Sequence, residues 1–156
     1  MKNLQIFSVA LTLSAIFYAC KDPVVTPDNT NNNTTSKTKQ ELLTSKNWKI
    51  TSLVSSSTDV WALLVAACNK DDQYHFRTDD SLCKYDMASK CTVSDPDSTV
   101  SIYKLYNNNT QLILNVKLTS SITLNDTADI LELNENSLKI NAEYSGLPAT
   151  IFFSHP

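Results

Sequence analysis

The chain has 156 residues, of which 13 are Lys or Arg and 16 are Asp or Glu, and its formal net charge is −3. This acidic balance does not fit a nucleic-acid-binding protein, which needs clustered basic side chains. The single glycine excludes dinucleotide-binding fingerprints, phosphate-binding loops and the hydrolase nucleophile elbow, because each of these requires several glycines.

An apolar leader opens the chain. The run from Leu4 to Ala19 is almost wholly apolar, with Lys2 in front of it, which is the layout of a secretory signal. A membrane-spanning helix needs about 20 apolar residues with flanking anchors, and this run is shorter. We therefore expect residues 1–19 to be a signal peptide, with an uncleaved anchor as the alternative.

The end of the leader carries a modification motif. At Phe17-Tyr18-Ala19-Cys20 the chain resembles a bacterial lipoprotein cleavage box, in which the thiol is acylated and the cut falls just before it. The resemblance implies lipid attachment at Cys20 and an outer-membrane lipoprotein of the bacterial cell envelope, on the periplasmic side or the cell surface. More than one acyl chain makes such attachment durable.

A polar stretch follows the leader. The segment "PVVTPDNTNNNTTSKTK" is poor in large apolar residues, so it cannot bury enough surface to offset its chain entropy. We expect residues 20–38 to form a disordered tether and residues 39–156 to form one folded domain. Loss of the leader removes one basic residue, which leaves 12 against 16 acidic residues and a net charge of about −4.

Short helices are expected in two places, before and after the first strand. Residues 40–45 predict one helical turn, and residues 60–67, in the run "VWALLVAA", predict another with Asp59 as its N-cap. The apolar run would cover one mouth of a barrel, either as a plug or as a lid over a ligand entrance.

Alternation of apolar and polar residues predicts strands through the rest of the domain. The clearest are "TQLILNVK" and "SLKINAEY", in which every second residue is apolar. Further strands are expected around Trp48 to Val54, Tyr74 to Phe76, Val100 to Ile102 and Ile151 to Phe153.

Asn and Asp mark the turns between these strands. With Gly146 as the only glycine, turns that need a positive φ must use Asn or Asp, which tolerate it best. The candidates are Asp79-Asp80, Asn107 to Asn109 and Asn134 to Asn136. Seven to nine short strands with tight turns predict an all-β fold, an eight-stranded antiparallel up-and-down barrel closed to remove its edges.

Three segments are similar to the lipocalin-like lipoproteins of Bacteroidetes: "LLTSKNWKITS", "DVWALLVAACNKDDQYHF" and "LELNENSLKI", with Lys90-Cys91 between the last two. The resemblance implies a lipocalin-like barrel with an extracytoplasmic location and no assigned chemistry. It also implies a disulfide between Cys68 and Cys91, which match the two cysteine positions of the family. Cys83 is an addition to the pattern, which we interpret as a free buried thiol; it could instead compete for a partner or link two copies.

The expected inward side chains carry no formal charge and would suit a small hydrophobic ligand. The candidate ligand-binding residues are Trp48, Ile50, Tyr74, Phe76, Leu114, Ile140 and Tyr144. The same side chains are bulky enough to fill the interior, so a solid core is the alternative. A buried phenol needs a hydrogen-bond partner, which a polar ligand group could supply.

No catalytic constellation stands out. His75 lies between two inward aromatic residues and is expected on the outward face, and no Ser or Cys can be tied to it as a nucleophile. The cysteine and histidine spacings do not match a zinc site. We therefore expect no enzyme activity, cofactor or metal. We expect binding of a small apolar or amphipathic molecule or, as the alternative, a solid-core envelope module that binds a protein or glycan.

Overall fold

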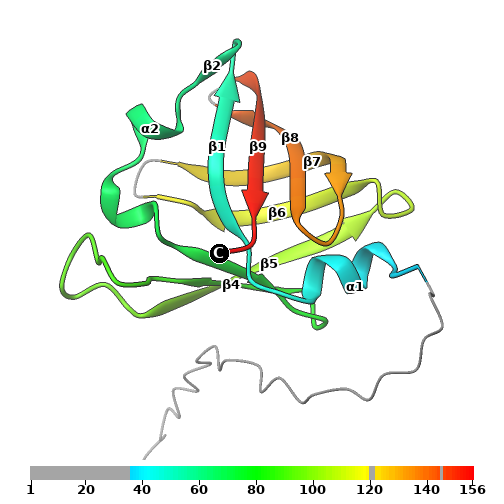
Figure 1. The fold of residues 1–156 in the computed structure, drawn as a ribbon, viewed down its shortest axis with the longest axis horizontal. Coiled ribbons are helices and arrows are strands. Elements are labelled where there is room, and N and C mark those ends of the chain that lie inside the picture. The colour runs from blue at the N-terminus through cyan, green and yellow to red at the C-terminus, as the bar shows by residue number, and fades with distance from the viewer. Residues whose placement is uncertain (1–35, 120–121, 145) are drawn as a thin grey trace, which may run out of the picture.

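A computed structural model describes residues 36–119, 122–144 and 146–156 (Figure 1). The expected signal peptide, the lipid-attachment residue Cys20 and most of the expected tether lie outside the described residues. Thr38, at the end of the expected tether, already belongs to the fold because its hydroxyl accepts a hydrogen bond from the Glu41 backbone.

The described residues form one antiparallel sheet of nine strands with three short helices. The helices are α1 (Lys39–Thr44), α2 (Trp61–Leu64) and the 3-10 helix η1 (Ala67–Asn69). The strands are β1 (Lys49–Ser55), β2 (Thr58–Asp59), β3 (Gln73–Phe76), β4 (Ser81–Tyr85), β5 (Ser98–Tyr106), β6 (Gln111–Lys117), β7 (Thr123–Leu133), β8 (Ser137–Tyr144) and β9 (Leu147–Ser154). The predicted antiparallel β fold with few helices is therefore confirmed.

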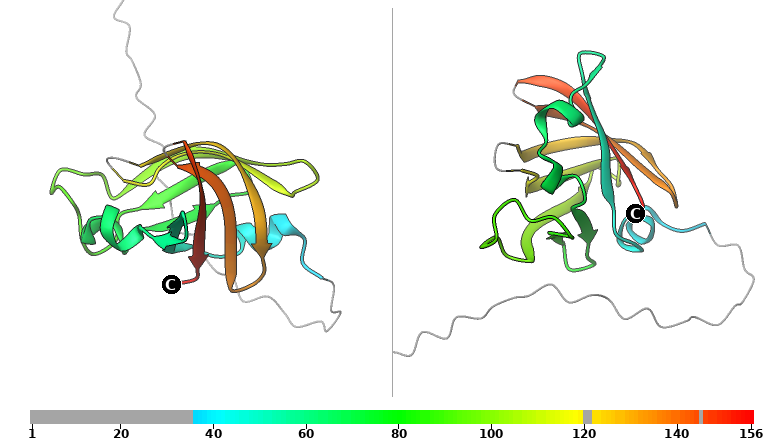
Figure 2. Two further views of the ribbon diagram at one scale, coloured as in Figure 1. Left: turned by 90° about the horizontal axis from the view of Figure 1, so that it is seen from above. Right: turned by 60° about the vertical axis from the view of Figure 1, so that its left-hand side comes forward.

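The strand order is β2-β1-β9-β8-β7-β6-β5-β4-β3, so the strands from β3 to β9 form a meander and β1 pairs with the last of them. The sheet curves strongly: β1, β8 and β9 run across the direction of β4, β5 and β6 (Figures 1 and 2). A single bridge joins Trp48, just before β1, to Tyr74 in β3 through two backbone hydrogen bonds of 2.8 and 2.7 Å. The strand order begins at β2 and ends at β3, and within the described residues no ladder joins these two edges of the sheet. The expected closed eight-stranded barrel is therefore not confirmed.

Helix α1 is fixed at both ends by hydrogen bonds. Thr38 and Glu41 form a capping box, which satisfies backbone N–H groups that the first turn leaves open. In the last turn of the helix, the Leu43 carbonyl accepts a 2.8 Å hydrogen bond from the Trp48 indole N–H. The helix contacts β3 and β7, and it therefore covers one end of the curved sheet.

Helix α2 is shorter than the sequence predicts. It spans four residues and ends at Leu64, because the next residue, Val65, adopts an extended conformation. Its N-cap is Val60, one residue after the expected Asp59, although the Asp59 carboxylate accepts a 2.9 Å hydrogen bond from the Trp61 N–H. Trp61 and Val65 are buried in the core, whereas Leu63 is 78% exposed.

A bulge in β1 changes which of its side chains face inward. The pairing with β9 shifts between Ile50 and Ser52, so one extra residue enters the strand. Leu53 is therefore fully buried, in place of Val54, which the sequence pattern suggested.

Positive φ values occur in two of the three expected Asn or Asp turns and also at two serines, whereas Asn134 to Asn136 have no positive φ. Asp80 has a φ of 62°, and Asn107, Asn108 and Asn109 have values of 50°, 54° and 61°. Asp79 supports the first of these turns, because its carboxylate accepts the Ser81 N–H at 3.2 Å. The serine pair at 56–57, in the turn between β1 and β2, was not predicted.

The bonding state of the cysteines agrees with expectation at Cys68 and Cys91 but not at Cys83. Cys68 and Cys91 form a disulfide with a Cα–Cα distance of 5.1 Å, which confirms this pairing. Cys83 is fully buried, and no described cysteine is a free thiol, so the interpretation of Cys83 as a free thiol is wrong. The spacing of three cysteines could not reveal this state, because a disulfide depends on distance in the fold.

Candidate functional site

The residues expected to bind a ligand lie in the packed core. Trp48, Ile50, Tyr74, Phe76, Leu114 and Ile140 are each at most 3% exposed. Apart from Leu114, none of them lines either of the two cavities described below. The Tyr144 backbone pairs with Leu147 in the β8–β9 ladder, and its side chain lies outside the described part of the structure.

Among the expected ligand residues whose side chains the structure describes, Tyr74 alone has an unused polar group. Its hydroxyl is buried and has no hydrogen-bond partner among the described residues. Burial raises the pKa of this phenol, and the nearby charges of Asp72 and Asp86 raise it further. The hydroxyl therefore stays protonated and remains a donor for any acceptor that reaches it.

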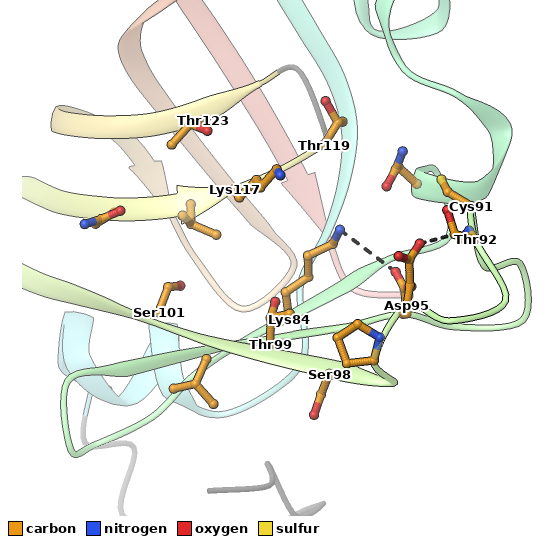
Figure 3. A pocket seen from close by; sticks show the side chains of 16 residues that line it. Lys84, Cys91, Thr92, Asp95, Ser98, Thr99, Ser101, Lys117, Thr119 and Thr123 are labelled. Carbon is orange, nitrogen blue, oxygen red and sulfur yellow. Dashed lines mark hydrogen bonds and ion pairs between the residues drawn. The ribbon is translucent and has the colours of Figure 1, made fainter. Parts of the chain in front are cut away.

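A cavity lies where β5 and β6 separate, and we call it the β5–β6 cavity. Its volume is about 660 Å³. Lys84, Thr99 and Ser101 line it from β4 and β5, whereas Lys117 and Thr123 belong to β6 and β7 (Figure 3). The remaining lining residues are Asn69, Asp86, Cys91, Thr92, Asp95, Pro96, Ser98, Val100, Asn115, Val116 and Thr119.

The cavity exists because the β5–β6 ladder is incomplete. Its register begins at Ile102 with Asn115 and continues to Tyr106 with Gln111. Strand β5 extends four residues beyond this ladder, from 98 to 101, and these residues pair only with β4. Strand β6 likewise continues to Lys117, paired only with β7. The two strand ends therefore lie apart, with the cavity between them.

A buried charge cluster lies beside the cavity. The Lys84 ammonium is 2.8 Å from the Asp72 carboxylate and 3.9 Å from the Asp86 carboxylate. Burial raises the pKa of Asp72 to about 6, because the loss of water outweighs the attraction of Lys84. The other Asp72 oxygen, Oδ1, has no hydrogen-bond partner among the described residues. Lys84 and Asp86 themselves line the cavity and can contact a ligand.

The disulfide holds a third wall of the cavity. Cys91 lies in the middle of the loop that joins β4 to β5, and its bond to Cys68 fixes that loop beside η1. Within the loop, the Thr92 N–H donates to the Asp95 carboxylate at 2.9 Å and the Asp95 N–H donates to the Thr92 carbonyl at 2.9 Å. Lys90 contacts Asp97 through an ion pair. These bonds pre-organise the wall before a ligand arrives.

A second, shallower cavity of about 550 Å³ lies on the outer face of β5 and β6. It contains three apolar side chains that are partly open to water: Val100, Ile102 and Ile113 are 48%, 65% and 39% exposed. We call these three residues the outer apolar patch. Val100 also lines the β5–β6 cavity, so the patch and the cavity adjoin along β5.

The two histidines serve structural contacts. His155 bonds through Nδ1 to the Asn47 carbonyl at 2.8 Å, and its ring lies 4.2 Å from the Trp48 ring. His75 pairs with Cys83 across β3 and β4, on the face opposite Tyr74 where the sequence predicted it, and it is nevertheless only 8% exposed. Within the described ranges, no group of three or more His, Cys, Asp or Glu side chains is arranged to hold a metal ion.

The sequence pattern did not predict the β5–β6 cavity, although the pairing of β4 with β5 shows the residues that mark it. Leu82 and Tyr103 are buried inward residues of β4 and β5. At the inward positions further along the same strands, the residues are Lys84, Thr99 and Ser101. Polar residues at inward positions mark the place where the core ends. This signal requires the strand register, which alternation alone did not supply.

Comparison with known proteins gives no relative: no protein-family model matches the chain, and no curated protein matches it. Among residues 36–119, 122–144 and 146–156, no helix has the length and apolar character needed to cross a bilayer.

Proposed function

We propose that the protein is a tethered, non-catalytic interaction module that binds a protein or glycan partner through the β5–β6 cavity. The observation that carries this proposal is the contrast between a packed apolar interior and a cavity in which most lining residues have polar side chains. Of its 16 lining residues, only Cys91, Pro96, Val100 and Val116 are apolar. Such a surface offers hydroxyl, amide and charged groups for hydrogen bonds to a polar partner.

The tether is the second part of the proposal. An acylated Cys20 would attach the domain to the outer membrane of a bacterial envelope, on the periplasmic side or at the cell surface. Metabolic labelling with an alkyne fatty acid, followed by intact-mass analysis, tests this attachment. The wild type should carry label and lack residues 1–19, whereas Cys20→Ser should carry no label. Retention of Met1 in the mature protein would contradict the proposal.

The fold supports a lipocalin-like barrel as the third part of the proposal. The Trp48–Tyr74 bridge brings β1 to β3, and closure at this point would give a barrel in which β2 lies outside the ring. Hydrogen exchange tests it, because the Trp48 and Tyr74 amides should be protected as strongly as those of β8. Rapid exchange of both amides would indicate an open sheet.

Variants that fill the cavity test the binding site. Thr99 is exposed in the cavity wall, so Thr99→Trp should fill the cavity without disturbing the core. Leu131→Trp is the matched control, because Leu131 is an exposed residue of β7 that lines neither cavity. The full chain is screened against arrays of bacterial glycans and displayed peptides. Binding that is lost in Thr99→Trp and kept in Leu131→Trp supports the proposal. Binding that is unchanged by Thr99→Trp places the site elsewhere.

The unpartnered Tyr74 hydroxyl favours a second candidate function, the binding of a small amphipathic molecule in the interior. A carboxylate or hydroxyl on such a molecule would accept the hydrogen bond that Tyr74 lacks. Native mass spectrometry of the purified protein tests this candidate with fatty-acid probes. A retained or added mass that is lost in Tyr74→Phe would favour it, and a bare protein mass would leave the interaction module.

A further inference from the structure

Backbone groups, and not only side chains, border the β5–β6 cavity. In an antiparallel strand, successive residues direct their N–H and C=O groups to opposite neighbours. The Tyr103 N–H donates to Asp80 and the Asp97 carbonyl accepts from Asp86, so odd-numbered residues of β5 face β4. Even-numbered residues therefore face β6.

Two of these even-numbered residues have no strand opposite them. The β5–β6 ladder ends at the pair of Ile102 and Asn115. Val100 and Ser98 lie beyond this pair in β5, so they direct their backbone groups into the cavity. On the opposite border, Leu118 bonds to Ile122 on the β7 side, so the neighbouring residue Lys117 faces β5. Continuing the register would pair Val100 with Lys117, and the structure contains no such pair among its described residues.

We propose that the β5–β6 cavity receives an extended peptide segment of a partner protein as an added strand. This inference rests on the proposed function and names the partner class. Unpaired strand edges are templates for pairing with another chain, and strand addition is a common mode of peptide recognition. A glycan has no such regular series of donors and acceptors, which is why the backbone pattern favours a peptide.

The direction of the added strand follows from the two borders. Because β5 and β6 are antiparallel, a strand between them is antiparallel to one and parallel to the other. Strand β5 offers four residues without a partner on this side, about 13 Å of edge, whereas β6 offers mainly Lys117. Antiparallel pairing is also slightly more stable per residue. The peptide therefore runs antiparallel to β5.

The two faces of the added strand would meet different surroundings. Side chains on one face point to Thr99, Ser101 and the Lys84 ammonium, which are polar. Side chains on the other face lie beside the outer apolar patch, which contains Val100 and Ile102. The recognised sequence therefore alternates polar and apolar residues, with the apolar ones covering the patch.

Panning a displayed library of random peptides of about ten residues against the full chain identifies a probe sequence. The best peptide is synthesised and its affinity measured for wild type, Val100→Pro and Val100→Thr. Proline removes the N–H that faces the cavity and is tolerated where no ladder partner is lost. Val100→Pro should weaken binding about tenfold, whereas Val100→Thr, which keeps the N–H, should change it less than about threefold.

Methylation of the peptide backbone provides a test that does not depend on the folding of a variant. Methyl groups placed on successive peptide nitrogens should reduce affinity at every second position along the part of the peptide that pairs with β5. Losses without this period of two, or equal affinity of Val100→Pro and wild type, would overturn strand addition. Enrichment of alternating polar and apolar sequences should accompany the expected result.

The same screen separates this inference from the proposed function. If a glycan binds in a Thr99-dependent manner and no peptide does, the interaction module stands and strand addition is wrong. If neither binds, both proposals fail.

Discussion

Replacement of Asp72 by Asn tests the buried charge cluster through its effect on stability. The pKa of Asp72 rises from an ordinary 3.8 to about 6 in the folded protein, chiefly through burial and despite the hydrogen bond and charge of Lys84. Between these two values the folded state binds more protons than the unfolded state, so stability falls as pH rises through this window. At about 1.36 kcal/mol per pH unit, the full effect is about 3 kcal/mol.

Asn has nearly the same shape as Asp, cannot ionise and keeps an oxygen that accepts a hydrogen bond from Lys84. The variant should therefore be more stable than wild type by up to about 3 kcal/mol above about pH 7, and the gain should disappear below about pH 4. Urea unfolding at a series of pH values measures this difference. The fluorescence of Trp48 and Trp61 reports unfolding, because both side chains are buried.

Lys84→Met supplies the control. Loss of the ammonium removes the attraction that lowers the Asp72 pKa, while Asp86 remains to raise it. In this background the window in which Asp72→Asn gains stability should move to higher pH. A gain that is the same at every pH, or a variant less stable than wild type above about pH 7, would refute the reasoning.

Three further changes test the disulfide, the core and a turn. Cys68→Ser should lower the free energy of unfolding by about 3 kcal/mol, because the Cys68–Cys91 bond closes a loop with a sequence separation of 23. Thermal unfolding should show this loss, and the difference should vanish when the wild type and the variant are both reduced. Trp48→Phe should lower the free energy of unfolding by at least about 1–3 kcal/mol, because the buried Leu43 carbonyl loses its indole donor. An unchanged midpoint in urea unfolding would show that this hydrogen bond contributes nothing. Asn108 has a φ of 54°, which Gly tolerates better than Ala. Asn108→Ala should therefore be less stable than Asn108→Gly by about 1 kcal/mol in thermal unfolding. The reverse order would contradict the turn geometry.

Local patterns predicted much of the sheet but not its connections. Alternation in "TQLILNVK" and "SLKINAEY" placed β6 and β8, and their alternate residues Leu112, Leu114, Leu138 and Ile140 are buried as expected. The bulge that turns Leu53 inward escaped prediction, because an extra residue in a strand depends on its pairing with β9. The buried position of His75 on the face opposite Tyr74 also required the fold.

The candidate site shows the same division. The sequence predicted a cleaved leader with lipid attachment at Cys20 and an apolar set of inward residues, and the family resemblance implied the Cys68–Cys91 pair. The structure confirms that disulfide. It did not predict the β5–β6 cavity, because Ser98 and Lys117 lie far apart in the chain and face a shared space only through the sheet.

The sequence by itself determined the β-rich class, the turns in which Asp80 and Asn107 to Asn109 have a positive φ, and the apolar faces of β6 and β8. Each of these follows from short-range periodicity and local backbone preference. Only the tertiary structure decided where the β5–β6 ladder ends and how Asp72, Lys84 and Asp86 come together beside the resulting cavity. Strand register and burial are properties of many distant contacts at once, so no single stretch of residues carries them.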